Sequence, residues 1–512
     1  MVEQQRHRLI VNVLSNYGTI ALYSIVNFIL VGYIVRKVGK EAFGLISLIM
    51  SLTIVTELLG RGVSYALTKH LSAAIIKKQD IDTNEFINTS VAWFFFCGFV
   101  GAVIYGVVAK YIDRLFDIPP ALISDARWAI GLMALKVIIC FPFNAFQGIL
   151  LAHQRYDLAN LSKSATIMFR FLAVILFFEF VSAGIIQLVV ITIISVVMEC
   201  FLWLLFSISI TENLQFRPSL VSRRAISTLF GFGGFITIIY VANMIGYEAV
   251  KWVIGLELSV VDVGGYSLIA AVAVAGDGLV RSISNVLMPV ASKYHALLQH
   301  DTNVRLTLLS TKYTMVMSSL FFLMPLLLLR PMLTLWVGNK YAPGYISELA
   351  QVGVVLLVGQ WFITTVVCIL QMLNGVGRVR VPAVVTISWA IGGLGIVWAY
   401  LHWGQGSLFA AVVGITIAKI IGTAVHMIYG LSVLRIPSRQ MFVGSIFRPA
   451  CAGIILCVIS YFLAGYFNVY RATSFITVVI ILVIMHALLV LILVLSKSER
   501  AGIVNTVRLF LH

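Results

Sequence analysis

The sequence predicts an all-α polytopic membrane protein with about 14 transmembrane helices, organised as two pseudo-equivalent six-helix lobes plus two C-terminal helices. The first observation is composition: 61% of the 512 residues are hydrophobic, 11% are charged, and the mean hydropathy is +1.02. Soluble domains are about half apolar and a quarter charged. The second observation is a series of apolar segments along the whole chain, and the third is an internal repeat. A soluble globular protein is therefore excluded.

Each predicted span is a segment of roughly 20 apolar residues, the length that crosses a bilayer. We expect a boundary at Val181–Gly184 within 159–210, and kinks where Pro142, Pro289 and Pro325 fall inside spans. The spans lie near residues 10–34, 42–66, 88–112, 126–152, 159–180, 182–210, 227–255, 262–290, 308–335, 346–373, 381–401, 407–431, 446–468 and 472–496.

The basic residues between the spans are distributed unequally. An even number of spans places both termini on one side, and most loop Lys and Arg residues fall on that side. The positive-inside rule then places both termini in the cytoplasm. The formal net charge of +16 follows from this orientation, and no long run of like charge predicts a nucleic-acid partner. The opposite side carries only Arg36, Lys37, Lys40, Lys110, Arg114, Arg330, Lys340 and Arg471.

No motif for a cofactor, a metal or a nucleotide is present. The six cysteines lie inside apolar segments and form no CxxC pair, so neither zinc binding nor a disulfide framework is indicated. A GxxxxGK[ST] phosphate-binding loop is absent from the sequence, which argues against direct ATP drive. We expect no bound cofactor. The longest loops, 67–87 and 113–125, leave no room for a soluble domain.

Residues of the first half recur 220 positions later. Glu57 precedes Arg61 by four residues in one predicted span, and the same charge pattern recurs in the second half. The two halves have equal orientation, which is the parallel repeat of known transporters. We predict an N-lobe at 1–215, a C-lobe at 216–435, and the last two spans with a short tail at 436–512. The matching pairs are Gly44 with Gly264, Glu57 with Asp277, Arg61 with Arg281, and Ser64 with Ser284.

Charged residues inside the spans are the candidate functional residues, because a Lys or Arg at the bilayer centre costs about 2.5–3.5 kcal/mol on insertion scales and usually faces a cavity. Spacing puts three oppositely charged pairs on shared helix faces, including Glu248 with Lys251. The basic residues are Arg61, Lys136, Arg170, Lys251, Arg281 and Lys419, and the acids are Glu57, Glu179, Glu199, Glu248 and Asp277.

The repeated acid–arginine pairs support two interpretations, which stay open at this point. The pairs could neutralise each other as structural salt bridges. Alternatively, Arg61 and Arg281 face a cavity and bind phosphate, because a guanidinium can hold phosphate oxygens bidentately. In that case Glu57 and Asp277 support the arginines or couple an ion.

Three further cations have no acid nearby on their own helix. Lys136 and Arg170 are the strongest candidates for contact with substrate. The alternatives are that each pairs with a residue on another helix or extends its charged group to the membrane surface. Lys419 aligns with Glu199 at the offset of the repeat, so these two could pair across the lobes. The candidates for substrate binding are therefore five cations: Arg61, Lys136, Arg170, Arg281 and Lys419. The candidate supporting or coupling acids are Glu57, Asp277 and Glu199.

Five short stretches carry a family pattern. They are Asn16-Tyr17-Gly18 through Asn27; Val38 to Gly44; Leu58-Leu59-Gly60-Arg61-Gly62 with Ala66 and Lys69; Gln147-Gly148 through His153-Gln154-Arg155-Tyr156; and Asn374-Gly375-Val376-Gly377-Arg378. With these stretches the chain resembles the multidrug/oligosaccharidyl-lipid/polysaccharide exporter superfamily, in its polysaccharide-transport, O-antigen flippase-like branch. The resemblance covers essentially the whole chain.

This resemblance implies a function that composition does not. It implies two six-helix lobes in a V, around a central cavity that opens alternately to each side, and a polyprenyl-pyrophosphate-linked oligosaccharide as substrate. The sugar–pyrophosphate head would cross through the cavity while the polyprenyl tail stays in lipid, moving an O-antigen, capsule or exopolysaccharide unit to the outer leaflet. A monomer in the bacterial inner membrane is expected, and coupling to protons or sodium stays open.

Two rival functions make different demands on the sequence. A cation-coupled multidrug exporter shares the fold, but such exporters carry an acid in the first span, and this one has none. A polysaccharide polymerase or glycosyltransferase usually needs a large external loop with catalytic acids. Here the longest external loop has Asp113, Asp117 and Asp125 without paired-acid spacing. The sequence therefore favours a transporter, not an enzyme.

Overall fold

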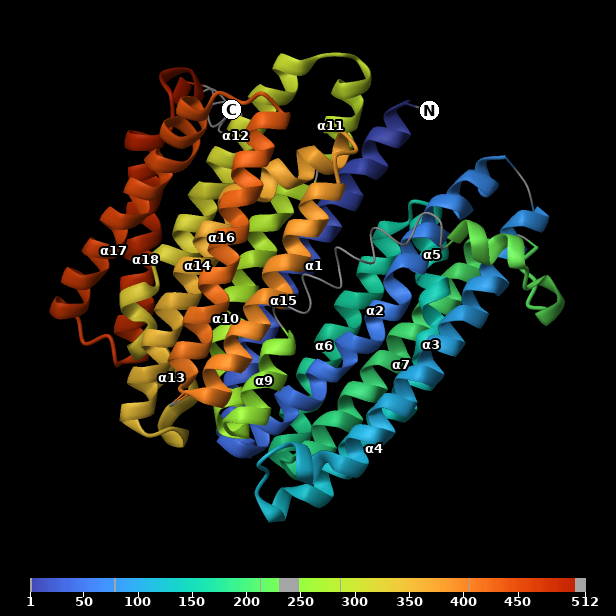
Figure 1. Ribbon diagram of the computed structural model, residues 1–512, viewed down its shortest axis with the longest axis horizontal. Coiled ribbons are helices and arrows are strands. Elements are labelled where there is room, and N and C mark those ends of the chain that lie inside the picture. Colours follow the sequence, from blue (N-terminus) through green and yellow to red (C-terminus); the bar gives the residue numbers. More distant parts are fainter. Residues whose placement is uncertain are drawn as a thin grey trace. The chain divides into compact units, whose positions relative to one another are not determined.

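The computed structural model describes residues 2–77, 80–211, 213–229, 248–285, 287–404 and 406–501, and these are almost entirely helical (Figure 1). The chain divides into two compact units. Unit 1 comprises Met1–Leu268 and Leu394–Ala411, and unit 2 comprises Ile269–Gly393 and Val412–His512.

Unit 1 is built mainly from the first half of the chain. Its elements are α1 (Val2–Val38), α2 (Lys40–Ile76), α3 (Asp80–Leu115), α4 (Pro120–Cys140), the 3₁₀ turn η1 (Phe141–Phe143), α5 (Asn144–Ala152), α6 (Tyr156–Phe180), α7 (Ile185–Ile210), the 3₁₀ turn η2 (Pro218–Leu220) and α9 (Val250–Glu257), with the beginnings of α10 and α16 and the end of α15.

Unit 2 holds the remaining elements. These are α10 (Val260–Asn285), α11 (Leu287–Ala296), α12 (His300–Ser318), the π-turn η4 (Ser319–Leu323), the 3₁₀ turn η5 (Leu326–Leu328), α13 (Leu329–Val337), the 3₁₀ turn η6 (Gly338–Lys340), α14 (Pro343–Gly375), α15 (Arg380–Trp403), α16 (Leu408–Val433), the π-turn η7 (Gln440–Phe447), α17 (Arg448–Tyr466), α18 (Ala472–Leu489) and the π-turn η8 (Val490–Val494).

The all-helical polytopic fold class is confirmed. Within the described residues, 12 helical segments are long and apolar enough to cross a membrane, and they coincide with the predicted spans other than the second and the seventh. The second predicted span lies on α2, a helix of 37 residues. The seventh, 227–255, falls largely outside the described residues. The predicted boundary at Val181–Gly184 is also confirmed, because α6 ends at Phe180 and α7 begins at Ile185.

Two of the three prolines that were expected to kink spans coincide with breaks in their helices. Pro142 lies in η1, between α4 and α5, and Pro325 lies between η4 and η5. A proline has no amide hydrogen to donate and its ring clashes with the preceding turn, so a continuous α-helix is disfavoured at both places. Pro289 falls on α11, immediately beyond residue 286, which is outside the described part of the chain.

The last two spans pack together within unit 2. Leu456 of α17 and Val478 and Leu482 of α18 form a buried cluster with Leu328. Gly453 lets α17 approach the broken part of the preceding span, because a Cβ there would lie 2.7 Å from Leu323 Cδ1 and 2.9 Å from Ser319 Cβ. The proline break thus coincides with the place where the C-terminal helices dock.

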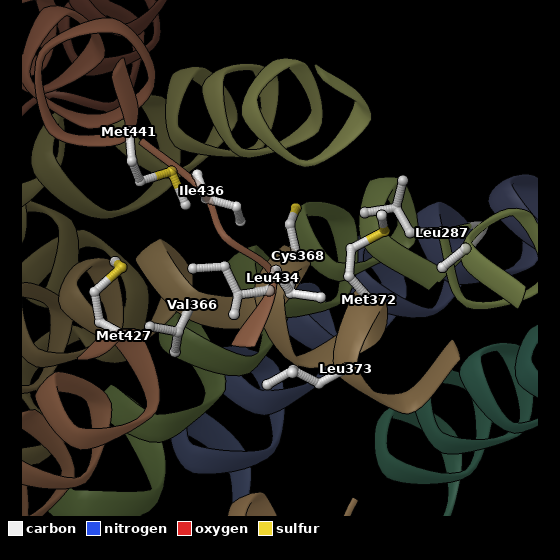
Figure 2. Close-up of a cluster of buried hydrophobic side chains, with 11 residues drawn as sticks. Leu287, Val366, Cys368, Met372, Leu373, Met427, Leu434, Ile436 and Met441 are labelled. Carbon is white, nitrogen blue, oxygen red and sulfur yellow. The ribbon is translucent and has the colours of Figure 1, made fainter. Parts of the chain in front are cut away.

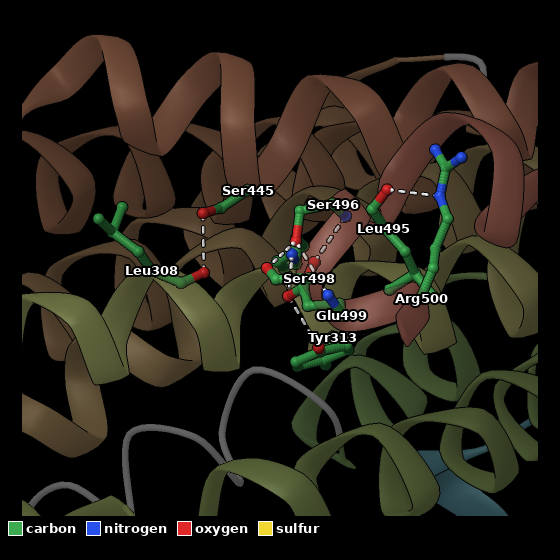
Figure 3. Close-up of polar contacts among 9 residues, drawn as sticks. Leu308, Tyr313, Ser445, Leu495, Ser496, Ser498, Glu499 and Arg500 are labelled. Atoms are coloured by element: carbon green, nitrogen blue, oxygen red, sulfur yellow. Dashed lines mark hydrogen bonds and ion pairs between the residues drawn. The ribbon is translucent and has the colours of Figure 1, made fainter. Parts of the chain in front are cut away.

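The segment after α18 turns back onto α12 (Figure 3). Ser496 and Glu499 form a reciprocal capping box, in which the Ser496 amide donates to Glu499 Oε2 at 2.7 Å and the Glu499 amide donates to Ser496 Oγ at 3.3 Å. Lys312 Nζ lies 2.5 Å from Glu499 Oε1, and the Tyr313 hydroxyl donates to the same oxygen at 2.9 Å. We call Lys312, Tyr313, Ser496 and Glu499 the C-terminal clasp.

A methionine-rich core fills a further part of unit 2 (Figure 2). It joins α14 through Val366, Cys368, Ile369, Met372 and Leu373 to Leu287, Ala291, Met427, Leu434, Ile436 and Met441. Partly buried Val304, Val376 and Val433 pack against this core. Because close-packed interiors resist deformation, this core holds the ends of α14 and α16 and the start of α12 in fixed positions.

Candidate functional site

A polar cluster lies inside the membrane-spanning part of unit 2, centred on Asp277 of α10. Arg281 lies one helical turn further on, with its Nε 2.6 Å from Asp277 Oδ2. Gln360 of α14 donates its Nε2 to the other carboxylate oxygen, Oδ1, at 2.7 Å. Gln360 is 4% exposed, so this bond ties two buried helices together. The side chain of Arg281 is 36% exposed, compared with 22% for Asp277.

Lys419 of α16 belongs to the same cluster. Its side chain is 5% exposed, and its Nζ lies 5.7 Å from the ring centroid of Trp389 on α15. Asp277 attracts the ammonium group and Arg281 repels it. In this conformation Lys419 is therefore enclosed by its own unit. A cation this deeply buried is retained when an opposite charge and an aromatic face compensate it.

Two glycines allow these helices to approach closely enough to form the cluster. A Cβ on Gly422 would lie 2.5 Å from Trp389 Cδ1, and a Cβ on Gly359 would lie 2.4 Å from Thr416 Cγ2. Small residues at helix contacts are the usual means by which membrane helices pack. The glycine at 422 lets Trp389 lie beneath Lys419, and the one at 359 brings α14 against α16.

Unit 1 carries a related set of polar residues on α4 and α7. Lys136 and Glu199 both act electrostatically on the thiol of Cys200, so all three lie in one neighbourhood. Cys200 Sγ donates to the carbonyl oxygen of Cys140 at 3.7 Å, which joins the two helices. Lys136 is half-buried. Glu199 and Lys419, aligned by the repeat, thus each have charged neighbours within their own unit.

The structure distinguishes Arg170 from the other intramembrane cations. Arg170 lies near the middle of α6 and is half-buried. Among the described residues it makes no hydrogen bond or ion pair. Glu179, at the end of the same helix, is instead held by Lys37, whose Nζ is 2.8 Å away, and by the Tyr33 hydroxyl at 2.9 Å. The guanidinium N–H groups of Arg170 therefore donate to no described residue and can bind another group.

The repeat-related pair in the N-terminal half lies on α2. The side chains of Glu57 and Arg61 are outside the described part of the structure, so their role stays a prediction. The third predicted pair is formed, since Lys251 Nζ lies 2.6 Å from Glu248 Oε2.

Sequence reasoning missed Gln360 and Trp389. A signal was available for Gln360, which interrupts the long apolar stretch of α14 with an amide that needs partners. Trp389 lies within α15, away from the helix ends where interfacial tryptophans gather. Neither residue could be assigned its charged partner, because the rotation of each helix about its axis depends on tertiary packing.

The fold has solved counterparts among transporters. The lipid II flippase MurJ in an inward closed conformation matches with a TM-score of 0.72 and 13% identity, over 94% of this chain and 98% of that chain. An inward-facing multidrug resistance MATE family transporter of the MOP superfamily matches with a TM-score of 0.69 and 14% identity, over 81% and 94%. The chain therefore has the fold of these transporters and is a multi-pass membrane protein.

The family is shown by sequence. The family model described as "Polysaccharide biosynthesis protein" matches residues 34–346, more than half of the 512 residues, and this chain belongs to that family. An uncharacterized membrane protein, EpsK of Bacillus subtilis (strain 168), is 20% identical over 484 residues, which are 93% of each chain. The predicted resemblance to the polysaccharide-transport branch is thereby confirmed.

Proposed function

We propose that this protein flips a polyprenyl-pyrophosphate-linked oligosaccharide from the cytoplasmic to the outer leaflet of a bacterial inner membrane. The observation that carries the proposal is the family match over residues 34–346, because it places the chain in the polysaccharide branch of a transporter fold. One solved counterpart of the fold is named as a lipid II flippase, which supports a lipid substrate.

The substrate's pyrophosphate is the group that the intramembrane cations would recognise. Arg170 supports this role, because its guanidinium has no described partner and can bind phosphate oxygens bidentately. We propose that Arg61, Lys136 and Arg281 contribute further positive charge. Lys419, enclosed beside Asp277, would act in another conformation or position Arg281. The acids Glu57, Asp277 and Glu199 would keep these cations in place.

Alternating access between the lobes at 1–215 and 216–435 is part of the same proposal, with both termini in the cytoplasm and the protein working as a monomer. The substrate's polyprenyl tail would remain in the surrounding lipid, because burying it in a polar cavity would forgo the favourable burial of apolar surface.

The test is translocation by the purified protein in liposomes. A fluorescent polyprenyl-pyrophosphate oligosaccharide becomes accessible to an enzyme or quencher outside the vesicle only after it crosses. The proposal expects protein-dependent crossing, and the absence of crossing by folded protein would overturn it.

A cation-coupled multidrug exporter is the second candidate. The half-buried carboxylate of Asp277 favours it, because an intramembrane acid can bind a proton or a sodium ion. The MATE counterparts fit this alternative as well. Export of a cationic dye against an imposed proton or sodium gradient, without lipid crossing, would decide for it.

A further inference from the structure

A second polar site lies at one end of unit 2, away from the Asp277 cluster. A cavity of about 390 Å³ opens between the C-terminal end of α11, the first turns of α12, the α14–α15 turn and the end of α16. Its volume falls within the range of small-molecule sites. It is lined by His295, His300, Asn303, Val304, Thr307, Val376, Arg378, Val433 and Leu434.

The base of this cavity is rigid. Val304, Val376 and Val433 pack against the methionine-rich core of Figure 2, and Leu434 is a member of that core. A pocket whose walls are the edge of a packed core keeps its shape when a ligand enters. The ordering of the pocket is therefore largely complete before binding, which favours affinity.

A buried polar atom in the cavity has no partner. Asn303 is 6% exposed, and its Oδ1 accepts no hydrogen bond from any described residue. Its Nδ2 is directed to the carbonyl oxygen of Ala291 at 3.5 Å. Leaving a buried acceptor unsatisfied is unfavourable, so this position is suited to a ligand that donates from a hydroxyl group.

The rim of the cavity has the opposite chemistry. His295, His300 and Arg378 are exposed at the opening, and they supply ring and guanidinium N–H donors. The cavity also adjoins the N-terminal turn of the 19-residue helix α12, where free amide groups favour an anion. Asp301, the acid of that turn, is not among the lining residues.

We propose that this cavity binds a phosphate ester that also carries a hydroxyl group, with the phosphate at Arg378 and the hydroxyl at Asn303. The phosphate ester could be the headgroup of an anionic lipid or a soluble molecule, and both present the same chemistry. The positive-inside rule places this end of unit 2 on the cytoplasmic side. The site is separate from the proposed translocation residues and does not depend on them.

The experiment measures binding of glycerol 3-phosphate to the full-length purified protein by calorimetry, with methyl phosphate as the probe that lacks hydroxyl groups. We expect glycerol 3-phosphate to bind more tightly than methyl phosphate, because only the former can donate to Asn303. Arg378→Gln should weaken binding tenfold or more, as expected for losing a charged hydrogen bond. Arg380→Gln is the matched control, since Arg380 lies two residues away and does not line the cavity, and it should bind normally.

A second arm identifies the source of the phosphate ester. The same variants are compared in nanodiscs of phosphatidylglycerol and of phosphatidylcholine, with the number of retained lipids measured by native mass spectrometry. Loss of one retained phosphatidylglycerol in Arg378→Gln alone supports the lipid headgroup. Failure of both probes to bind in an Arg378-dependent way would overturn the proposal. That failure would leave lipid-linked oligosaccharide crossing unaffected, so the two proposals are tested separately.

Discussion

Gly44 of α2 and Gly264 of α10, which the internal repeat aligns with each other, are in direct backbone contact. A Cβ on Gly44 would lie 3.2 Å from the amide nitrogen of Gly264 and only 1.7 Å from the carbonyl oxygen of Val260. The second helix of each half therefore crosses its repeat equivalent at equivalent residues, within unit 1. Such self-contact is what a two-fold pseudo-symmetric contact requires.

Gly44→Ala should destabilise the protein. The added methyl group has no space, because it meets backbone and not a flexible side chain, and overpacking of this kind costs about 1–3 kcal/mol or more. Thermal unfolding in detergent, followed by tryptophan fluorescence, measures the effect. Gly106→Ala is the matched control, because nothing lies within 4 Å of its Cβ position. Equal unfolding temperatures for both variants would show that α2 and α10 do not pack this closely.

The Asp277 cluster predicts a rescue. Asp277→Asn leaves Lys419 and Arg281 without their carboxylate. Removing one partner of a fully buried pair costs about 3–5 kcal/mol, and the loss here should be smaller because Asp277 is 22% and Arg281 36% exposed. Adding Lys419→Met removes the uncompensated charge, so the double variant should recover much of the lost stability. A double-mutant cycle of unfolding temperatures measures this coupling. Additive losses would mean that Asp277 and Lys419 do not interact.

Arg170→Ala should slow lipid crossing by about tenfold or more while leaving stability nearly unchanged, since a charged hydrogen bond to substrate is lost and no described partner is left behind. Arg170→Lys should be intermediate, because an ammonium group cannot bind phosphate bidentately. Glu179→Gln, on the same helix, is the control. It breaks the pair with Lys37, and the rate of lipid crossing in liposomes with this variant should equal that of the wild type. A lipid-crossing rate of Arg170→Ala equal to that of the wild type would show that Arg170 does not belong to the proposed site.

The C-terminal clasp predicts a pH dependence. Burial raises the pKa of the Glu499 carboxyl, but hydrogen bonds from Lys312, Ser496 and Tyr313 outweigh burial and hold the pKa at about 2. A depressed pKa stabilises the fold above the unfolded-state value of about 4.3, and that contribution is lost as the pH falls towards 2. The difference in unfolding temperature between wild type and Glu499→Gln should therefore be constant above about pH 5 and shrink on acidification. A difference that does not change with pH would contradict the clasp.

Part of this architecture could be predicted because it depends on local sequence. The spacing of Asp277 and Arg281 places them on one helix face, and the observed 2.6 Å contact follows from that spacing. The repeat likewise aligned Gly44 with Gly264 without any knowledge of their contact. The split between α6 and α7 was also visible, because Gly184 and its neighbours interrupt the apolar sequence.

The remainder depends on how helices are rotated and packed. Nothing in the spacing of Gln360 or Trp389 indicates that each lies beside a charge on a different helix. The position of Trp389 beside Lys419 depends on the close approach at Gly422, and the one at Gly359 brings α14 against α16. The enclosure of Lys419 has the same origin, and so has the cavity beside Asn303, whose four walls come from distant parts of unit 2.

The central claim is that the protein moves a lipid by recognising its anionic head. The most direct measurement is the initial crossing rate, in liposomes containing the wild-type protein, of two fluorescent polyprenyl glycans that differ only in the linkage, one a pyrophosphate and the other an uncharged ether. The account predicts rapid protein-dependent crossing of the pyrophosphate-linked glycan and slow crossing of the neutral one. Equal rates for the two, or crossing of neither, would contradict it.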